Sequence, residues 1–205
     1  MGEYVLVQPR RERLALRAGA GLRNVIAAVV LAFLITCSLP GQARPSQYDV
    51  EAAYLLDFGK FLRSSGESQA FRHTTFDVCI IGHDSLGRSI DRLAANEAID
   101  GREVRVLRGV TPLQARTCAI AFIPDGDDEA IREDLRVFSR RDVLTVSDAP
   151  NFLNNGGMIQ FVLQKDHVRF AVNLDALRKT RLVLSSQLIR VALYVMGHPL
   201  PEGKP

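Results

Sequence analysis

The chain has 205 residues, with 26 Lys or Arg against 23 Asp or Glu and a formal net charge of +3. Five of the bases and two of the acids lie in residues 1–43, so residues 44–205 hold 21 of each. This neutral balance argues against the basic surface that nucleic-acid binding requires, and we expect no nucleic-acid partner. Roughly 160 residues are the size of one ordinary domain.

The N-terminus has the layout of a secretory signal peptide. A stretch with five arginines precedes the apolar run Val25–Leu39, and Gly41–Ala43 follows. A basic region, a short apolar region and a small-residue cleavage site are typical of such peptides. The apolar run is shorter than the ~20 residues of a membrane-spanning helix. We therefore predict a signal peptide over residues 1–43, cleaved near Ala43. An uncleaved anchor and a lipoprotein with its lipid on Cys37 are the alternatives.

Helices and strands alternate through the first two thirds of the remaining chain. Tyr48–Leu62 has apolar residues at helical spacing and predicts an amphipathic first helix, and the polar stretch Arg63–Thr75 predicts a loop. The pattern then predicts, in chain order, strand 76–82, helix 86–96, strand 103–107, short helix 112–116, strand 118–123, helix 128–139 and strand 143–147. Such alternation produces a largely parallel sheet with helices on both faces, so we expect a single α/β domain.

The last third predicts a turn, a hairpin and a final helix. We assign positive φ angles to Gly156-Gly157, since glycine adopts them without steric cost. The runs Met158–Leu163 and Val168–Asn173 are separated by four polar residues, which is typical of an antiparallel hairpin. Ser185-Ser186 predicts the N-cap of a helix that continues through Met196.

Cys79 and Cys118 form an even pair of cysteines after the predicted signal peptide. Each lies in a predicted strand, and an exported protein meets an oxidising compartment that favours disulfides. A bridge between them would stabilise the fold by about 4 kcal/mol. Two buried thiols are the alternative. Two separated cysteines without clustered histidines do not supply a zinc ligand set, so we expect no metal and no cofactor.

Two polar segments at predicted strand ends are candidates for ligand binding. His83, Asp84 and Ser85 lie in a strand-to-helix turn, where backbone N–H groups can hold an anion or nucleotide. The turn lacks G-x-G-x-x-G spacing, so an ordinary capped turn is the alternative. Ser147 and Asp148 end a predicted parallel strand, where α/β folds bind ligands, but both also suit a turn. No nucleophile elbow is present, and we expect no enzyme.

Several segments together resemble the YfiR family of exported regulators, and the likeness runs from about Val50 to about Val195. The segments are EAAYLLDFGKF (Glu51–Phe61), VLTVSD (Val143–Asp148), GGMI (Gly156–Ile159), VRFAVNLDAL (Val168–Leu177) and LSSQLIRVA (Leu184–Ala192). The resemblance implies a periplasmic α/β/α sandwich, a Cys79–Cys118 disulfide and a homodimer. It also implies repression of a membrane-bound diguanylate cyclase through its periplasmic sensor domain, which lowers cyclic-di-GMP and biofilm formation.

The chain departs from the family after the first helix, where members commonly have a Trp-Pro pair and this chain has Arg63-Ser64-Ser65. It also lacks the second cysteine pair that some members carry. From these two departures we expect the end of the first helix to bind differently from that of other family members. We also expect any redox response to depend on one disulfide.

Two functions follow as expectations. The first is an inhibitory protein that docks on the cyclase through aromatic anchors, because interfaces favour aromatic residues. Tyr54 and Phe58 on the first helix and Phe161 and Phe170 on the hairpin are the candidates. The alternative is a periplasmic binding protein for a small ligand, a nucleotide or an amino acid, held at the carboxyl ends of the parallel strands.

Overall fold

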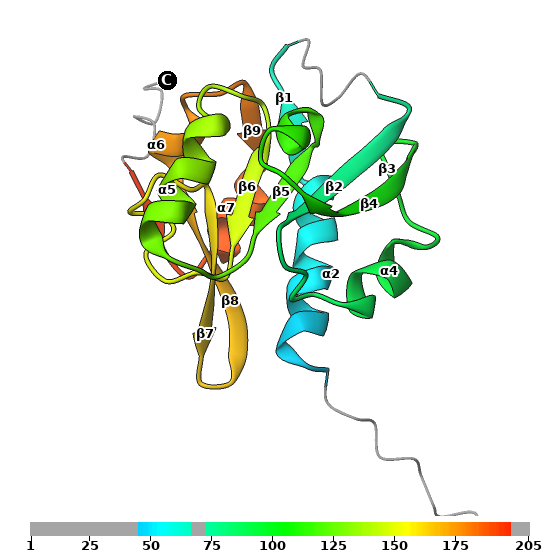
Figure 1. The fold of residues 1–205 in the computed structure, drawn as a ribbon, viewed down its shortest axis with the longest axis horizontal. Helices are drawn as coiled ribbons and strands as arrows, with labels where there is room; N and C mark the ends of the chain where they lie inside the picture. The colour runs from blue at the N-terminus through cyan, green and yellow to red at the C-terminus, as the bar shows by residue number, and fades with distance from the viewer. Residues whose placement is uncertain (1–44, 67–72, 198–205) are drawn as a thin grey trace, which may run out of the picture. The chain divides into compact units, whose positions relative to one another are not determined.

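A computed structural model describes residues 45–66 and 73–197, and the predicted signal peptide lies outside the described residues. The described part contains an eight-stranded sheet with the order β10-β8-β7-β6-β5-β2-β4-β3 (Figure 1). Its strands are β2 (Thr75–Ile81), β3 (Ala98–Ile99), β4 (Arg102–Val110), β5 (Ile120–Ile123), β6 (Leu144–Ser147), β7 (Ile159–Gln164), β8 (His167–Asn173) and β10 (Val195–Met196).

Most neighbouring strands are parallel, as the alternating pattern predicts. Strands β2, β4, β5, β6 and β7 run in one direction, while β7 and β8 form the predicted antiparallel hairpin. Lys165 and Asp166 at the hairpin tip both have positive φ, the conformation that a two-residue turn needs to match the strand twist. The predicted α/β fold with a largely parallel sheet and a C-terminal hairpin is confirmed.

Helices cover both faces of the sheet (Figure 1). They are α2 (Gln47–Lys60), α4 (Arg88–Ala94), the 3₁₀ helix η1 (Gln114–Thr117), α5 (Asp128–Val137), α6 (Leu174–Leu177) and α7 (Ser186–Val191). A capping box starts α2, in which the hydroxyl of Ser46 accepts the N–H of Asp49 and the carboxylate of Asp49 accepts the N–H of Ser46. Asn173 caps α6 in a similar way by accepting the N–H of Ala176 at 3.0 Å.

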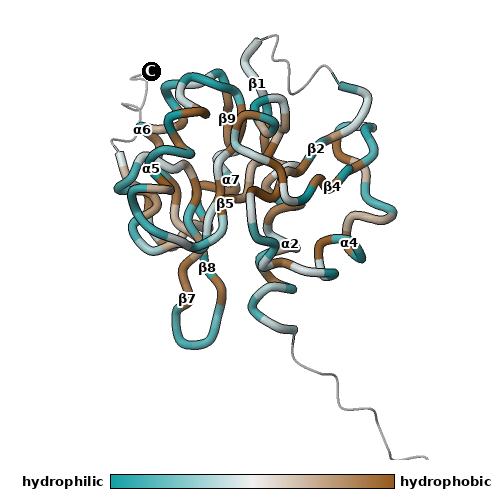
Figure 2. The backbone as a smooth tube through the Cα atoms, viewed as in Figure 1, coloured by the Kyte–Doolittle hydropathy of each residue, from teal (hydrophilic) through white to brown (hydrophobic). Residues whose placement is uncertain are grey.

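Two apolar clusters fill the two sides of the sheet. Because successive side chains of a strand point to opposite faces, Val78 and Ile80 pack toward α2 and α4, whereas Cys79 and Ile81 pack toward α5. In Figure 2, β5 and much of the β7–β8 hairpin are hydrophobic, whereas the tip of the hairpin is hydrophilic. The burial of alternate residues on both faces explains why the parallel strands read as continuous apolar runs.

The chain after Val191 differs from the prediction. The predicted helix through Met196 ends at Val191, since Ala192 is extended, and Val195–Met196 forms the edge strand β10 beside β8. The N–H of Leu193 donates to the carbonyl of Phe170 at 2.7 Å. Pairing with the open edge of β8 therefore replaces the last predicted helical turn, and the β-branched Val195 favours the extended form.

The start of the predicted loop at Arg63–Thr75 is also different. Leu62–Ser64 forms strand β1, which pairs with the antiparallel strand β9 (Leu182–Leu184) in a separate two-stranded sheet. The two short strands stabilise each other although more than 110 residues of chain separate them. The local sequence pattern around either strand does not indicate so distant a partner.

The two glycines of the Gly156-Gly157 turn have different roles. Gly156 has φ +102°, as predicted, but Gly157 does not have a positive φ. A Cβ atom on Gly157 would lie 2.1 Å from the ring of Phe152, so close packing excludes any larger residue. Steric contact, and not backbone conformation, therefore explains Gly157.

Candidate functional site

The sheet has a topological switch point between β2 and β5. The chain leaves β2 for β4 on one side and then returns to β5 on the other side, so the loops after β2 and β5 diverge at the carboxyl ends of these strands. Open α/β sheets bind ligands at such points. The carboxyl edge of the sheet, meaning the ends of β2, β5 and β6, contains all five residues that the sequence singles out for ligand binding.

In the loop after β2, Asp84 has internal partners. Its Oδ1 atom accepts the backbone N–H groups of Leu86 and Gly87, both at 3.0 Å. Its Oδ2 atom accepts Nε–H of Arg108 at 2.7 Å. These bonds make Asp84 the centre of a capped turn before α4. The adjacent His83 is exposed, and the Ser85 hydroxyl is buried without a hydrogen-bond partner in the described part of the chain.

At the end of β6, Ser147 and Asp148 also have internal partners. The hydroxyl of the buried Ser147 accepts the N–H of Ala149 at 2.9 Å. The Oδ1 atom of Asp148 accepts the N–H of Asp125 at 2.9 Å, which ties the loop after β6 to the loop after β5. Burial raises the pKa of Asp148 above its ordinary value. This arrangement corresponds to the turn alternative for both residues.

Helix α2 brings to this region a carboxyl group that sequence reasoning missed. Glu51 is 1% exposed, and its Oε1 atom accepts Nε2–H of Gln47 at 2.8 Å while Oε2 has no partner among the described residues. Burial raises the pKa of Glu51 to about 7, the hydrogen bond from Gln47 opposes that shift, and the negative charge of Asp148 adds to it. Helical spacing could have predicted the burial of Glu51, because this residue shares a face of α2 with the buried Leu55 and Phe58.

The candidate interface aromatics lie mostly inside the domain, which corrects the sequence-based interpretation. Phe58, Phe161 and Phe170 are at most 4% exposed, and the rings of Phe58 and Phe170 meet edge to face at 5.0 Å. Tyr54 is half-buried and stacks on Phe58 at 5.8 Å. The rings join α2 to the hairpin because the apolar face of the helix needs a partner on the sheet. Three of the four rings are therefore core residues, and only Tyr54 reaches the surface.

Cys79 and Cys118 form a disulfide with a Cα–Cα distance of 6.1 Å. It joins β2 to the residue that follows η1, on the α5 side of the sheet. Both cysteines are buried, so the bridge lies within the core. The free-thiol alternative does not describe this structure.

Apolar side chains are exposed near the C-terminal end of the described residues. Val191 is 57% exposed at the end of α7, and Tyr194 and Val195 follow it at the edge of the sheet at 45% and 37%. We call Val191, Tyr194 and Val195 the C-terminal apolar segment. A group of neighbouring exposed apolar residues is typical of a surface that contacts another molecule.

The described residues contain no group of three or more His, Cys, Asp or Glu that could hold a metal ion. In the same part of the chain, no helix is long and apolar enough to cross a membrane. The model of the YfiR/HmsC-like family matches residues 48–193, which is more than half of the chain. The chain belongs to the YfiR/HmsC-like family. No curated protein matches it.

Membership in the YfiR/HmsC-like family confirms the resemblance noted in the sequence. The match starts inside α2 and ends between α7 and β10, so it includes the disulfide, the hairpin and both faces of the sheet. The family is one of regulatory proteins without catalytic activity. The internal bonds of Asp84, Ser147 and Asp148 agree with a structural role for these residues.

Proposed function

We propose that this protein is a periplasmic repressor of a membrane-bound diguanylate cyclase. It is exported by the signal peptide of residues 1–43, acts as a homodimer, and binds the periplasmic sensor domain of the cyclase. This binding lowers cyclic-di-GMP and biofilm formation. The observation that carries the proposal is membership in the YfiR/HmsC-like family over residues 48–193.

The C-terminal apolar segment supports a protein-binding role. Val191 at the end of α7 and Tyr194 and Val195 at the edge of the sheet are exposed apolar residues, and aromatic and apolar side chains are enriched in the buried centre of interfaces. Tyr54, the half-buried member of the aromatic candidates, remains a second proposed contact. The alternative function, binding a nucleotide or an amino acid at the carboxyl edge, has less support because Asp84, Ser147 and Asp148 already have internal partners.

Affinity purification from membranes tests the proposed partner. A tagged full-length protein, expressed in its own host and cross-linked in intact cells, should recover a diguanylate cyclase with a periplasmic domain. Val191→Asp should lower that recovery about tenfold or more, because a charge at the centre of an interface is costly. Leu113→Asp is the matched control, since Leu113 is 64% exposed and precedes η1.

Two results would overturn different parts of the proposal. If the wild-type protein recovers no diguanylate cyclase, the repressor function is wrong. If Val191→Asp and Leu113→Asp recover the cyclase equally, the C-terminal apolar segment is not the contact. Both substitutions are at exposed positions, so the variants should fold like the wild type, which circular dichroism checks.

A further inference from the structure

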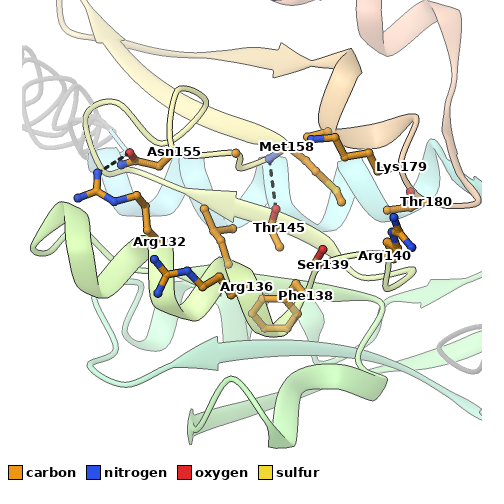
Figure 3. Close-up of a pocket in the computed structure, with 13 residues that line it drawn as sticks. Arg132, Arg136, Phe138, Ser139, Arg140, Thr145, Asn155, Met158, Lys179 and Thr180 are labelled. Carbon is orange, nitrogen blue, oxygen red and sulfur yellow. Dashed lines mark hydrogen bonds between the residues drawn. The ribbon is translucent and has the colours of Figure 1, made fainter.

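A cavity of about 500 Å³ lies on the α5 side of the sheet, near the start of β6 and β7. Its lining comes from α5 and the residues after it, from the segment before β7, and from the residues after α6 (Figure 3). It is therefore separate from the carboxyl edge, where the sequence predicts ligand binding. Cavities of ~300–1,000 Å³ are the usual size of small-molecule sites.

The cavity is lined by four cationic side chains and by no acidic one. These are Arg132, Arg136, Arg140 and Lys179. Arg132 and Arg136 are at adjacent turns of α5 and share the carboxylate of Glu129, at 2.8 Å and 3.4 Å. Figure 3 shows Arg132 and Asn155 on one side of the cavity and Arg140 and Lys179 on the other.

One cationic side of the cavity is held in place by bonds. The Nη1–H of Arg132 donates to Oδ1 of Asn155 at 3.1 Å, and Nδ2–H of Asn155 donates to Oδ1 of Asp128 at 2.9 Å. This chain of hydrogen bonds connects α5 to the segment before β7, so it fixes the wall between them. Asp128 and Glu129 both lie in the first turn of α5, so their negative charges also stabilise the N-terminus of this helix.

The other cationic side is not neutralised. The side chains of Arg140 and Lys179 have no hydrogen-bond or ion-pair partner within residues 45–66 and 73–197, and both are exposed. The two acids of the opposite side have other partners, since Glu129 pairs with Arg132 and Arg136 and Asp128 accepts Nδ2–H of Asn155. Two of the four cationic side chains in the lining, Arg140 and Lys179, are therefore unpaired among the described residues.

The floor of the cavity combines a hydroxyl group with apolar surface. Thr145 on β6 is 1% exposed, and its Oγ1 atom accepts the N–H of Met158 at 3.2 Å (Figure 3). A hydroxyl that accepts one bond still has a proton to donate. Leu135, Phe138 and Met158 supply the apolar part of the lining. A ligand here would meet the unpaired Arg140 and Lys179 at one end, the guanidinium groups of Arg132 and Arg136 at the other, and a buried hydroxyl donor between them.

We propose that this cavity binds a small organic dianion, with two carboxylate or phosphate groups separated by a short, partly apolar body. The two unpaired cations, Arg140 and Lys179, match two negative charges, and the guanidinium groups of Arg132, Arg136 and Arg140 suit planar, bidentate recognition of such oxygens. The walls come from three chain segments around a buried floor, so a small molecule would be contacted from several sides, which a flat lipid surface would not be. The site does not depend on the proposed repressor function.

Isothermal titration calorimetry on the protein of residues 44–205 tests this site. The probes are the dicarboxylates glutarate and succinate, phosphoglycolate with one carboxylate and one phosphate group, and inorganic phosphate, each at low ionic strength, so that carboxylate and phosphate ligands are distinguished. At least one organic probe should bind with one-to-one stoichiometry and a Kd below about 1 mM. Binding should weaken as sodium chloride is added, because the attraction is ionic.

Three variants locate the binding. Arg140→Ala with Lys179→Ala should weaken binding about tenfold or more, since both unpaired cations are lost. Thr145→Val, which preserves shape and removes the hydroxyl, should weaken binding about fivefold. Lys165→Ala with Arg190→Ala is the matched control, because it removes the same charge from exposed positions outside the cavity and should leave the Kd within about twofold.

The proposal is overturned by any of three results. These are no saturable binding of any organic probe, equal weakening by the cavity variant and its control, and binding of inorganic phosphate alone. Sedimentation with vesicles that contain an anionic phospholipid covers the membrane alternative. If the cavity variant reduces vesicle binding while no small anion binds, the surface recognises lipid and the proposed ligand class is wrong.

Discussion

The carboxyl edge of the sheet and the cationic cavity both gather polar side chains, but they differ in how those side chains are paired. At the carboxyl edge, Asp84 and Ser147 accept backbone N–H groups of their own loops, and Asp148 accepts one from the loop after β5. In the cavity, Arg140 and Lys179 have no described partner. Polar groups with internal partners stabilise a fold, whereas unpaired charges around a cavity are available to a ligand. Position in the topology alone therefore does not identify a binding site.

The largest expected effect on stability concerns the buried Cys79–Cys118 disulfide. Replacing Cys79 and Cys118 together by Ala should lower the free energy of unfolding by about 4 kcal/mol, because the bridge closes a long loop in the unfolded chain. The sequence separation is 39 residues. Urea unfolding of the double variant and the wild type measures the difference.

The same experiment with a reductant provides the control. Wild-type protein in dithiothreitol should unfold at the urea concentration of the double variant, while the variant itself should not respond to the reductant. An unchanged midpoint for the reduced wild type would contradict the contribution of the bridge.

The next effect concerns Glu51 beside the carboxyl edge. The pKa of this carboxyl is raised from 4.5 to about 7 in the folded protein. Between these values the unfolded chain is ionised and the folded chain is protonated, so unfolding releases a proton and stability falls as the pH rises from 4.5 to 7. The loss should reach about 3 kcal/mol above pH 7. Glu51→Gln should remove this loss, which urea unfolding at a series of pH values measures.

Glu103→Gln is the matched control for this pH dependence. Glu103 is exposed on β4, so its replacement should leave the pH profile unchanged. If Glu51→Gln keeps the wild-type fall in stability between pH 4.5 and 7, burial of Glu51 is not its cause.

A smaller effect is expected at Asp84. Asp84→Ala removes the acceptor of two backbone N–H groups and the partner of Arg108, so it should lower the free energy of unfolding by about 2 kcal/mol. Chemical denaturation measures this loss. A change below about 0.5 kcal/mol would mean that these bonds contribute little and that the carboxyl edge is less firmly paired than the structure indicates.

The smallest effect on stability is expected at the cavity. Arg140→Ala removes a side chain without a described partner, so the free energy of unfolding should change by less than about 0.5 kcal/mol. Denaturation under the conditions used for Asp84→Ala gives a direct comparison of the two regions. A loss as large as that of Asp84→Ala would show that Arg140 supports the fold and would remove the contrast.

The main elements were predictable because their signals are local. The apolar run of β2, the polar residues of the hairpin tip and the cap at Ser185 each lie within a few residues of the structure they specify. The short strands β1, β9 and β10 were not predictable in this way. Their backbone partners come from distant segments, as with the N–H of Leu193 and the carbonyl of Phe170.

The functional residues were harder to predict for the same reason. Phe161 and Phe170 read equally well as surface anchors or as core, and their contact with Phe58 on α2 decides the question. Arg140 and Lys179 line the same cavity although 39 positions separate them in the chain. In the sequence, each looks like an ordinary basic residue of the surface. Glu51 alone left a signal, as a charged residue on the apolar face of α2.

Cellular cyclic-di-GMP tests the repressor function most directly. Deletion of the gene in its own host should raise the cyclic-di-GMP level and biofilm mass, and expression of the full-length protein should restore both. Expression of residues 44–205 without the signal peptide should not restore them, because that form stays in the cytoplasm. A cyclic-di-GMP level that is unchanged by the deletion, measured by mass spectrometry in cells that contain the cyclase, would contradict the proposed function.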